Sequence, residues 1–300
     1  MEDISLEEVM KKYKLPQEEH DRIGKEVQKI WLNGKKPVDN PTVMIILGPP
    51  GSGKTGLDGY SSKYFEDGNV VVINSDEIKT FQPGIGEVAK KYPQYYTQVS
   101  GQESKSWTQD LFENALKQKY NLVFELTGKN AEILNSIKQQ MQEYKVVVRG
   151  MAVSDLNCLL SILERYEYQV QTRGWGRLVA QKHFDEAYSG MPETIDLIEK
   201  SGLADAVEIY MRGEEPSDPI KIYSSKNENK YQTAQRAILE CREKDYKNAS
   251  ASFEDRINNI CTLMKGREDS LCQEEKTIIE YAKEIYEKKR QESLKDELEL

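Results

Sequence analysis

The sequence predicts an α/β protein, with a doubly wound and mostly parallel sheet flanked by helices and an all-helical appendage at its C-terminal end. Three observations predict this fold. Short apolar runs alternate with segments of helical periodicity. A glycine-rich loop follows the first apolar run directly. After about residue 225 the chain has no strand signal, and its apolar residues keep helical spacing.

Composition limits the classes of function. The chain has 300 residues, of which 38% are hydrophobic, enough for one large domain or two smaller ones. A formal net charge of −9 argues against a protein that binds nucleic acid over its whole surface. No apolar run approaches membrane-spanning length, and the charged N-terminus lacks an apolar signal segment. The four cysteines include no C-x-x-C pair, so we expect reduced thiols, no zinc site and a cytoplasmic protein.

The N-terminal segment predicts two helices. Ser5 and Glu8 have the spacing of a capping box, which starts the first helix. Pro16 suits the first turn of a second helix that ends at Asn33-Gly34. One face of this helix carries its apolar residues, Ile23, Val27, Ile30 and Trp31.

Six short apolar runs predict the strands, at 43–47, 69–74, 121–125, 145–148, 207–210 and 220–223. Helical patterning covers 104–119 and 156–168, and an irregular stretch rich in Tyr and Gln precedes the first of these. Ligands of a doubly wound sheet bind at the carboxyl ends of its strands. Gly48, Asp76 and Glu125 all fall at such ends, so we expect the functional site there.

The first strand leads into a phosphate-binding loop, which fills every fixed position of G-x-x-x-x-G-K-[ST]. Its glycines permit a tight turn that aims backbone N–H groups inward. Lys54 is expected to reach the β- and γ-phosphates, and the Thr55 hydroxyl to hold Mg²⁺. The motif predicts a P-loop kinase-like fold, with nucleotide-binding residues Gly48, Pro49, Pro50, Gly51, Ser52, Gly53, Lys54 and Thr55.

Two acidic residues at strand ends are candidates for the acceptor side of a phosphoryl transfer. Asp76 could orient and deprotonate an acceptor hydroxyl. An equally supported local interpretation is that Ser75 or Asp76 caps a short helix. Glu125 could hold Mg²⁺ through water or grip a sugar hydroxyl, while the alternative is a helix start capped at Thr127.

Three arginines form the candidate cationic group. Arg165, Arg173 and Arg177 could neutralise charge that develops on the transferred phosphoryl group. The alternative for each is a solvated surface charge or an ordinary ion pair. The Gly174-Trp175-Gly176 insertion makes this segment flexible, which favours a lid.

Together these segments resemble the zeta-toxin family in order along residues 20 to 225. The resemblance is carried by GKKPVDNPTVMIILGPPGSGKT, NSDEIK, YNLVFELTGK, MAV followed by ERYE, and the run from Arg177 through Gln181-Lys182-His183 to Ser201-Gly202-Leu203. Members are P-loop kinases of toxin–antitoxin systems. The resemblance implies that ATP or GTP, with Mg²⁺, phosphorylates the 3′-hydroxyl of the amino sugar of UDP-N-acetylglucosamine, which blocks cell-wall precursor synthesis.

The resemblance also implies roles for individual residues. Lys54 matches the phosphate-binding lysine, Asp76 the catalytic aspartate, and Arg165 and Arg177 the two arginines near the phosphates. The substrate-binding positions correspond to Asp76, Gln109, Glu125, Thr127 and Lys129. Three departures stand out. Lys129 replaces an arginine, Gln109 replaces an acidic residue, and the Arg177 match needs a one-residue gap, so that Arg173 could take its place.

We expect two domains, a kinase domain at 1–225, on which N-terminal helices 1–34 pack, and a helical domain at 226–300. Zeta toxins are silenced by a small helical antitoxin, so 226–300 could supply that function in cis as an autoinhibitory domain. Tethering would raise its effective concentration to roughly millimolar. The alternative is a set of helices that packs on the kinase core or makes a dimer contact.

Other classes of function stay open. One is a P-loop kinase of another small molecule or of a nucleic-acid 5′ end, although the acidic balance and the absence of a basic-aromatic stripe count against nucleic acid. Another is a non-catalytic nucleotide-binding switch. A regulatory GTPase is disfavoured because no N-K-x-D motif is evident.

Overall fold

A six-stranded sheet organises the chain in the computed structural model, which describes residues 4–215, 218–227, 230–267, 271 and 273–298. The strand order is β2-β3-β1-β4-β5-β6. Neighbours from β2 to β5 pair in parallel, and β6 pairs antiparallel with β5. The strands are β1 (Thr42–Leu47), β2 (Val71–Ile73), β3 (Leu122–Leu126), β4 (Lys145–Met151), β5 (Ala206–Met211) and β6 (Ile220–Ser224). The predicted α/β fold, with its mostly parallel sheet, is confirmed.

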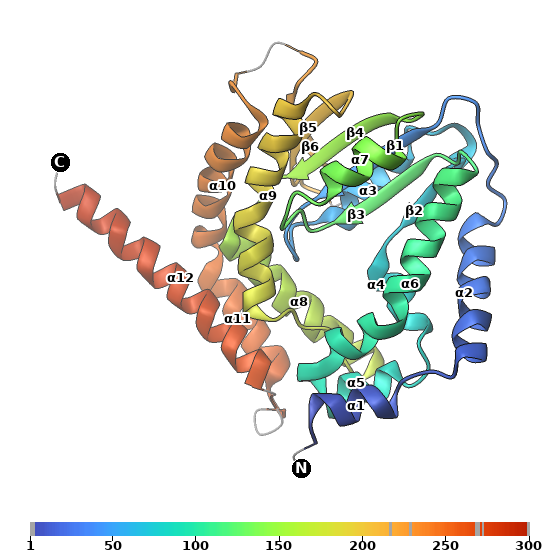
Figure 1. Ribbon diagram of the computed structural model, residues 1–300. Helices are drawn as coiled ribbons and strands as arrows, with labels where there is room; N and C mark the ends of the chain where they lie inside the picture. Colours follow the sequence, from blue (N-terminus) through green and yellow to red (C-terminus); the bar gives the residue numbers. More distant parts are fainter. Residues whose placement is uncertain (1–3, 216–217, 228–229, 268–270, 272, 299–300) are drawn as a thin grey trace.

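Helices cover both faces of this sheet (Figure 1). The α-helices of the first 225 residues are α1 (Leu6–Lys12), α2 (Gln17–Leu32), α3 (Lys54–Ser62), α4 (Ser75–Ile78), α5 (Ile85–Lys91), α6 (Tyr96–Lys117), α7 (Ile133–Gln140), α8 (Asp155–Arg173) and α9 (Gln181–Ser201). Short 3-10 helices lie at Glu66–Gly68, Lys79–Phe81 and Pro93–Tyr95.

The alternation of side chains along β1 separates two hydrophobic clusters. Val43 and Ile45 join the cluster that includes residues of α2, α6, α7 and α9. Met44 and Ile46 join the other, with residues of α3 and α8. Every residue of β1 is buried, as expected for the central strand of a sheet covered on both faces.

The N-terminal helices are held mainly by α6. The predicted capping box of α1 is present, since the Ser5 hydroxyl accepts from the Glu8 N–H and the Glu8 carboxylate accepts from the Ser5 N–H. On α2, His20 Nδ1 lies 2.6 Å from Glu103 Oε2, and its ring stacks on Trp107 with centroids 5.2 Å apart. Ile30, predicted on the apolar face of α2, is 49% exposed.

The helix expected at 104–119 begins earlier, at Tyr96, and α5 also lies in the stretch predicted to be irregular. Tyr96, Val99 and Ser100 are buried on this added part of α6. Tertiary packing therefore extends the helix through a segment whose polar composition obscures its periodicity.

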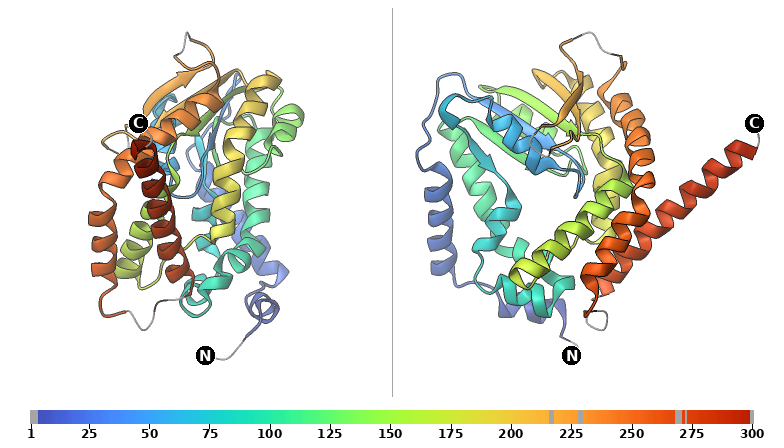
Figure 2. Two further views of the ribbon diagram at one scale, coloured as in Figure 1. Left: turned by 90° about the vertical axis from the view of Figure 1, so that its left-hand side faces the viewer. Right: turned by 180° about the vertical axis from the view of Figure 1, so that it is seen from behind.

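Among the described residues after 230, the α-helices are α10 (Ala234–Ala251), α11 (Phe253–Met264) and α12 (Gln273–Leu298). They pack against α8 and α9, and the C-terminal part of α12 extends away from the body (Figure 2). Ala237 and Ile238 of α10 belong to the first hydrophobic cluster, whereas Phe253 and Ile257 of α11 belong to the second. The C-terminal helices thus share both clusters with the sheet. Within the described ranges, no helix has the length and apolarity to cross a membrane.

Candidate active site

The phosphate loop joins the carboxyl end of β1 to α3. Gly51 and Gly53 have φ values of +77° and +92°, a region that favours glycine. A Cβ atom at Gly51 would lie 2.2 Å from the carbonyl oxygen of Cys158 on α8. The loop therefore packs directly on the backbone of α8, and its shape depends on that helix.

Lys54 lies folded beneath this loop. Its Nζ donates to the carbonyl oxygens of Gly48, at 2.9 Å, and Pro49, at 3.1 Å. The same atom lies 3.5 Å from Glu125 Oε1 at the end of β3. Thr55, the next residue, is exposed at the start of α3. The ammonium group and the acidic residue are thus adjacent at the carboxyl edge of the sheet.

Asp76 is not a helix cap, so that alternative is wrong. The residue that caps α4 is Asn74, whose Oδ1 accepts from the Asp76 N–H at 2.9 Å. Asn74 Nδ2 donates to Glu125 Oε2 at 3.0 Å. Asn74 therefore fixes the start of the helix that carries Asp76 and also orients Glu125, while the Asp76 carboxylate stays free of capping.

Two cations hold the Asp76 carboxylate. Lys79 Nζ lies 2.9 Å from Asp76 Oδ1, and Arg177 Nη1 lies 3.4 Å from the same oxygen. Arg177 Nη1 also donates to the Asp76 carbonyl oxygen at 3.1 Å. Burial alone would raise the pKa of Asp76, but Lys79 and Arg177 outweigh it and hold the pKa well below its usual range. Asp76 is therefore ionised at neutral pH.

Arg165 completes the cationic group. Burial, followed by the nearby charge of Arg177, lowers the pKa of Arg165, while Asp76 and Glu125 raise it. The Nε atoms of Arg165 and Arg177 are buried and have no hydrogen-bond partner within the part of the chain that the structure describes. Two guanidinium groups beside one carboxylate favour an anionic ligand between them.

The segment that carries Arg177 crosses from α8 to α9. Gly174 ends α8 with φ +74°, and Trp175 packs against Tyr96, with ring centroids 6.1 Å apart. Arg173 stacks over Trp175 at 3.8 Å and donates to its carbonyl oxygen. Because Arg173 is engaged with Trp175, the geometry favours Arg177 as the residue that reaches Asp76.

The loop after β3 carries two further predicted site residues, Thr127 and Lys129. Thr127 is half-buried and does not begin a helix, since α7 starts at Ile133. Lys129 Nζ lies 3.6 Å from Glu186 Oε2 on α9. Burial and the charges of Lys129, Lys79 and Lys54 lower the pKa of His183, which places this α9 residue within the electrostatic reach of three lysines around the site.

Gln109 lies outside this group of charged residues. It is exposed on α6, and its Nε2 donates to Glu113 Oε1 at 2.5 Å. Phe112, three residues further along α6, stacks on Phe124 of β3 with centroids 4.6 Å apart. Phe124 and Glu125 are neighbours on β3 and point to opposite faces of the sheet, so this contact does not bring Gln109 toward Glu125.

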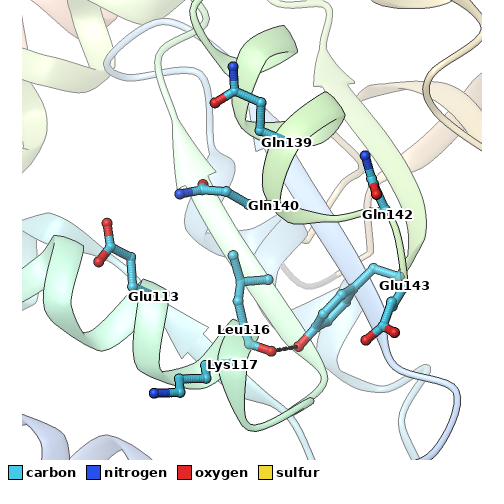
Figure 3. A pocket seen from close by; sticks show the side chains of 8 residues that line it. Glu113, Leu116, Lys117, Gln139, Gln140, Gln142 and Glu143 are labelled. Carbon is cyan, nitrogen blue, oxygen red and sulfur yellow. Dashed lines mark hydrogen bonds between the residues drawn. The ribbon is translucent and has the colours of Figure 1, made fainter.

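A hollow of about 520 Å³ lies elsewhere on the surface (Figure 3). It is lined by Glu113, Leu116, Lys117, Gln139, Gln140, Gln142, Glu143 and Tyr144. These residues belong to the C-terminal ends of α6 and α7 and to the segment that leads into β4. The hollow is therefore at the amino edge of the sheet, opposite the phosphate loop, and is not part of the candidate active site.

Three residues of the site were missed by the sequence analysis: Asn74, Lys79 and Asp58. Lys79 could have been found from its i,i+3 spacing to Asp76, and Asn74 from its place at a strand end before a helix. Asp58 lies four residues after Lys54, on the same face of α3. It is 4% exposed, and burial and the adjacent Glu125 raise its pKa to about 9.

Comparison with known proteins places the chain among toxins. A sequence model of the zeta toxin family matches residues 28–228. Toxin zeta of Streptococcus pyogenes is 31% identical over 199 residues, 65% of this chain and 67% of that protein. Toxin PezT of Streptococcus pneumoniae serotype 4 is 24% identical over 196 residues, 64% of this chain and 75% of that protein.

Solved structures show the same fold. One from the PezAT chromosomal toxin-antitoxin system of Streptococcus pneumoniae has a TM-score of 0.68 and 20% identity, and the match covers 83% of this chain and 99% of that one. The AvrRxo1-ORF1:AvrRxo1-ORF2 complex with ATP has a TM-score of 0.56 and 14% identity, with 92% of each chain covered. The match to the first structure extends beyond the 201 residues of the family model and so includes part of the C-terminal helices.

Proposed function

Because this chain belongs to the zeta toxin family, we propose that it is a kinase that transfers the γ-phosphate of ATP or GTP to the 3′-hydroxyl of the amino sugar of UDP-N-acetylglucosamine. The transfer would block cell-wall precursor synthesis. Family membership supports a toxin with phosphotransferase activity. The sugar nucleotide is the finer part of the proposal, and it rests on the match of individual residues.

The observation that carries the proposal is the Asp76 carboxylate, held by Lys79 and Arg177 near the phosphate loop. Phosphoryl transfer needs an oriented acceptor hydroxyl and cations over the transferred group. Asp76, as an anion, would accept the hydrogen bond of the acceptor hydroxyl and take its proton as the O–P bond forms. Arg177 and Arg165 would stabilise the charge on the equatorial oxygens, and Lys54 the β- and γ-phosphates.

Mg²⁺ would supply charge neutralisation between the β- and γ-phosphates. The exposed Thr55 at the first turn of α3 suits this ion, which is usually bound through one or two protein ligands, phosphate oxygens and water. A nucleotide co-substrate is supported further by the AvrRxo1 structure of similar fold, which was determined with ATP.

Glu125, Thr127 and Lys129 would contact the sugar nucleotide, together with Gln109 across the site. Lys54 and Asn74 hold the Glu125 carboxylate from two sides, so one defined orientation is presented to a hydroxyl group. Lys129 supplies a positive charge without the bidentate fork of arginine, and Gln109 supplies an amide in place of a carboxylate. These two positions are the ones at which the choice of sugar nucleotide could differ within the family.

The test is transfer of phosphate by the full chain with ATP, Mg²⁺ and a panel of UDP-sugars, read by mass spectrometry. We expect one added phosphate on UDP-N-acetylglucosamine, at the 3′-hydroxyl by NMR. Asp76→Asn should lower the rate at least about a thousandfold and leave ATP affinity within roughly twofold. Asp39→Asn is the matched control, because Asp39 is exposed and precedes the opposite, amino end of β1.

Three other outcomes would contradict the proposal in different ways. Phosphate transfer to a different small molecule or to a nucleic-acid 5′ end would keep the kinase and change the acceptor. ATP binding with no transfer to any acceptor would favour a non-catalytic switch. Equal activity of Asp76→Asn and the Asp39→Asn control would remove Asp76 from the mechanism.

An antitoxin partner belongs to the same proposal, because the PezAT structure comes from a toxin–antitoxin system. Residues 226–300 were expected either to supply that function in cis or to pack on the kinase core. The shared hydrophobic clusters support packing on the core. We therefore propose a separate protein as the antitoxin and a structural function for the C-terminal helices.

A further inference from the structure

Arg212, just after β5, holds the outside of the phosphate loop. Its Nη2 donates to the carbonyl oxygen of Gly51 and its Nε to that of Ser52, the latter at 3.3 Å. Its Nη1 donates to Asn157 Oδ1 and Ser161 Oγ on α8, both at 3.0 Å. One guanidinium group thus joins the phosphate loop to α8.

Arg256 brings the C-terminal helices to the same two residues of α8. From α11, its Nη1 donates to Asn157 Oδ1 at 2.9 Å, and its Nη2 to Ser161 Oγ at 3.3 Å. It also makes a bidentate pair with Glu164, at 2.7 and 2.8 Å. Glu164 directly precedes Arg165, one of the arginines beside Asp76.

Asn157 is the centre of this arrangement. Its oxygen accepts from both arginines, and its Nδ2 lies 3.1 and 3.2 Å from the two carboxylate oxygens of Asp245 on α10. Asp245 is buried and also accepts from the Ser154 N–H and hydroxyl at the start of α8. The amide of Asn157 is therefore held in one orientation by α10, α11 and the end of β5.

The positive charges of Arg212 and Arg256 are balanced only when their acidic neighbours are in place. Two guanidinium groups approach one amide oxygen and repel each other. The Glu164 carboxylate compensates Arg256, and the Asp245 carboxylate supplies a second negative charge beside Asn157, while the loop carbonyls accept the hydrogen bonds of Arg212. Loss of Arg256 would leave Asn157 and Ser161 free to rotate, so that Arg212 would lose its fixed acceptors on α8 and its hold on the loop would weaken.

We propose that Arg212 and Arg256 are positioning residues for the nucleotide site, and that the C-terminal helices promote nucleotide binding through them. The inference rests on the proposed function only in that the phosphate loop binds Mg²⁺–ATP. Arg212 keeps the loop carbonyls turned outward, so the N–H groups face the phosphates. Arg256 keeps α8 and Arg212 in the arrangement that does this.

The test compares two arginines of the C-terminal segment in the full chain. Arg256→Gln removes the contacts with Asn157, Ser161 and Glu164. Arg267→Gln is the control, because Arg267 also contacts an acidic residue of α8. Its Nη2 donates to both carboxylate oxygens of Glu167, at 2.7 Å, and it also pairs with Glu275 of α12 at 3.3 Å. Glu167 lies three residues beyond Glu164, away from the loop. The measurement is the Kd of Mg²⁺–ATP by calorimetry, with Tm recorded for each variant.

We expect both variants to lower Tm, because each removes a contact between α8 and the C-terminal helices. Arg256→Gln should raise the Kd of Mg²⁺–ATP roughly tenfold, whereas Arg267→Gln should change it less than about twofold. Arg256→Lys, which keeps one charged contact, should give an intermediate Kd and provides the measurement if the glutamine variant does not fold. Asn157→Ala combined with Arg256→Gln should raise Kd less than the two single effects multiplied.

Equal Kd values for the two glutamine variants would overturn the inference, since the contact would then serve stability alone. Tighter ATP binding by Arg256→Gln would also overturn it and would favour autoinhibition by the C-terminal helices. The experiment requires no sugar acceptor. A wrong assignment of UDP-N-acetylglucosamine would therefore leave the Kd comparison intact, whereas a wrong inference would leave phosphate transfer intact.

Discussion

Two helices at the carboxyl edge of the sheet, α3 and α4, each carry an aspartate, and their surroundings drive the pKa values in opposite directions. Asp76 on α4 is half-buried and lies beside Lys79 and Arg177. Its pKa is held well below the usual range. Asp58 on α3 is 4% exposed and lies beside Glu125, and its pKa is raised to about 9.

The difference shows how one residue type serves two purposes in one site. Burial raises the pKa of both carboxyl groups, so the neighbours decide the outcome. Cations keep Asp76 charged and able to accept a hydrogen bond from an acceptor hydroxyl. Burial, reinforced by the neighbouring Glu125, keeps Asp58 protonated at neutral pH beside Lys54.

Among the cations around Asp76, the largest effect is expected for Arg177, which would also serve the phosphates. Arg177→Ala should lower kcat roughly a hundred- to a thousandfold, because an arginine over the transferred phosphoryl group stabilises its developing charge. Arg173→Ala is the control, since Arg173 stacks on Trp175 instead. Single-turnover kinetics with saturating ATP would measure both. A larger loss for Arg173→Ala would reverse the assignment that the geometry favours.

A second prediction tests whether Lys79 keeps Asp76 ionised, and it leaves the Asp76 side chain itself unchanged. Removing Lys79 should let burial raise the pKa of Asp76, so the acid limb of kcat/KM should move upward by roughly one to two pH units in Lys79→Met. Wild-type kcat/KM should lack this limb between pH 5 and 8.

The control is Lys91→Met. Lys91 makes an ion pair of 2.8 Å with Glu87, close in length to the 2.9 Å pair of Lys79 and Asp76, and both partners lie on α5. Its pH profile should follow that of the wild type. If the acid limb of Lys79→Met coincides with that of the wild type down to the lowest pH at which both proteins stay folded, Lys79 does not hold Asp76 ionised.

The sequence predicted the parts of this site that are local in the chain. The phosphate motif is contiguous, and parallel strands bring Gly48, Asp76 and Glu125 to one edge whatever the details of packing. Local pattern did not reveal that α6 starts at Tyr96, because burial of that turn by tertiary contacts overrides its polar composition.

Contacts between distant residues were the least predictable. Arg212 is 55 residues from Asn157, and Arg256 is 99 residues from it, so no motif relates them. The same holds for the pair of Asp58 and Glu125. Lys54 and Asp58 share a helix face by spacing alone, but the raised pKa depends on a carboxylate supplied by another strand. The charge on a site residue therefore follows from packing that the sequence pattern does not contain.

The smallest expected effect is on thermal stability, and it tests the raised pKa of Asp58. The folded protein keeps a proton on Asp58 up to about pH 9, whereas the unfolded chain loses it near pH 4. Between these values the folded state binds more protons, so stability falls as pH rises. Asp58→Asn abolishes this proton uptake and keeps a hydrogen-bond donor beside Glu125. The variant should therefore melt above the wild type by roughly 3–6 °C at pH 8.

The sign of that difference follows from the direction of the pKa shift. The gain in Tm of Asp58→Asn over the wild type should be smallest at pH 4 and should grow steadily toward pH 9, without nucleotide or Mg²⁺ present. Asp39→Asn, an exposed aspartate, should show no such growth. A gain that is constant with pH would mean that Asp58 is not protonated in the folded state. In that case Asp58 and Asp76 would both be anions. Lys54 would then face the charged Asp58 in addition to its partner Glu125 behind the loop.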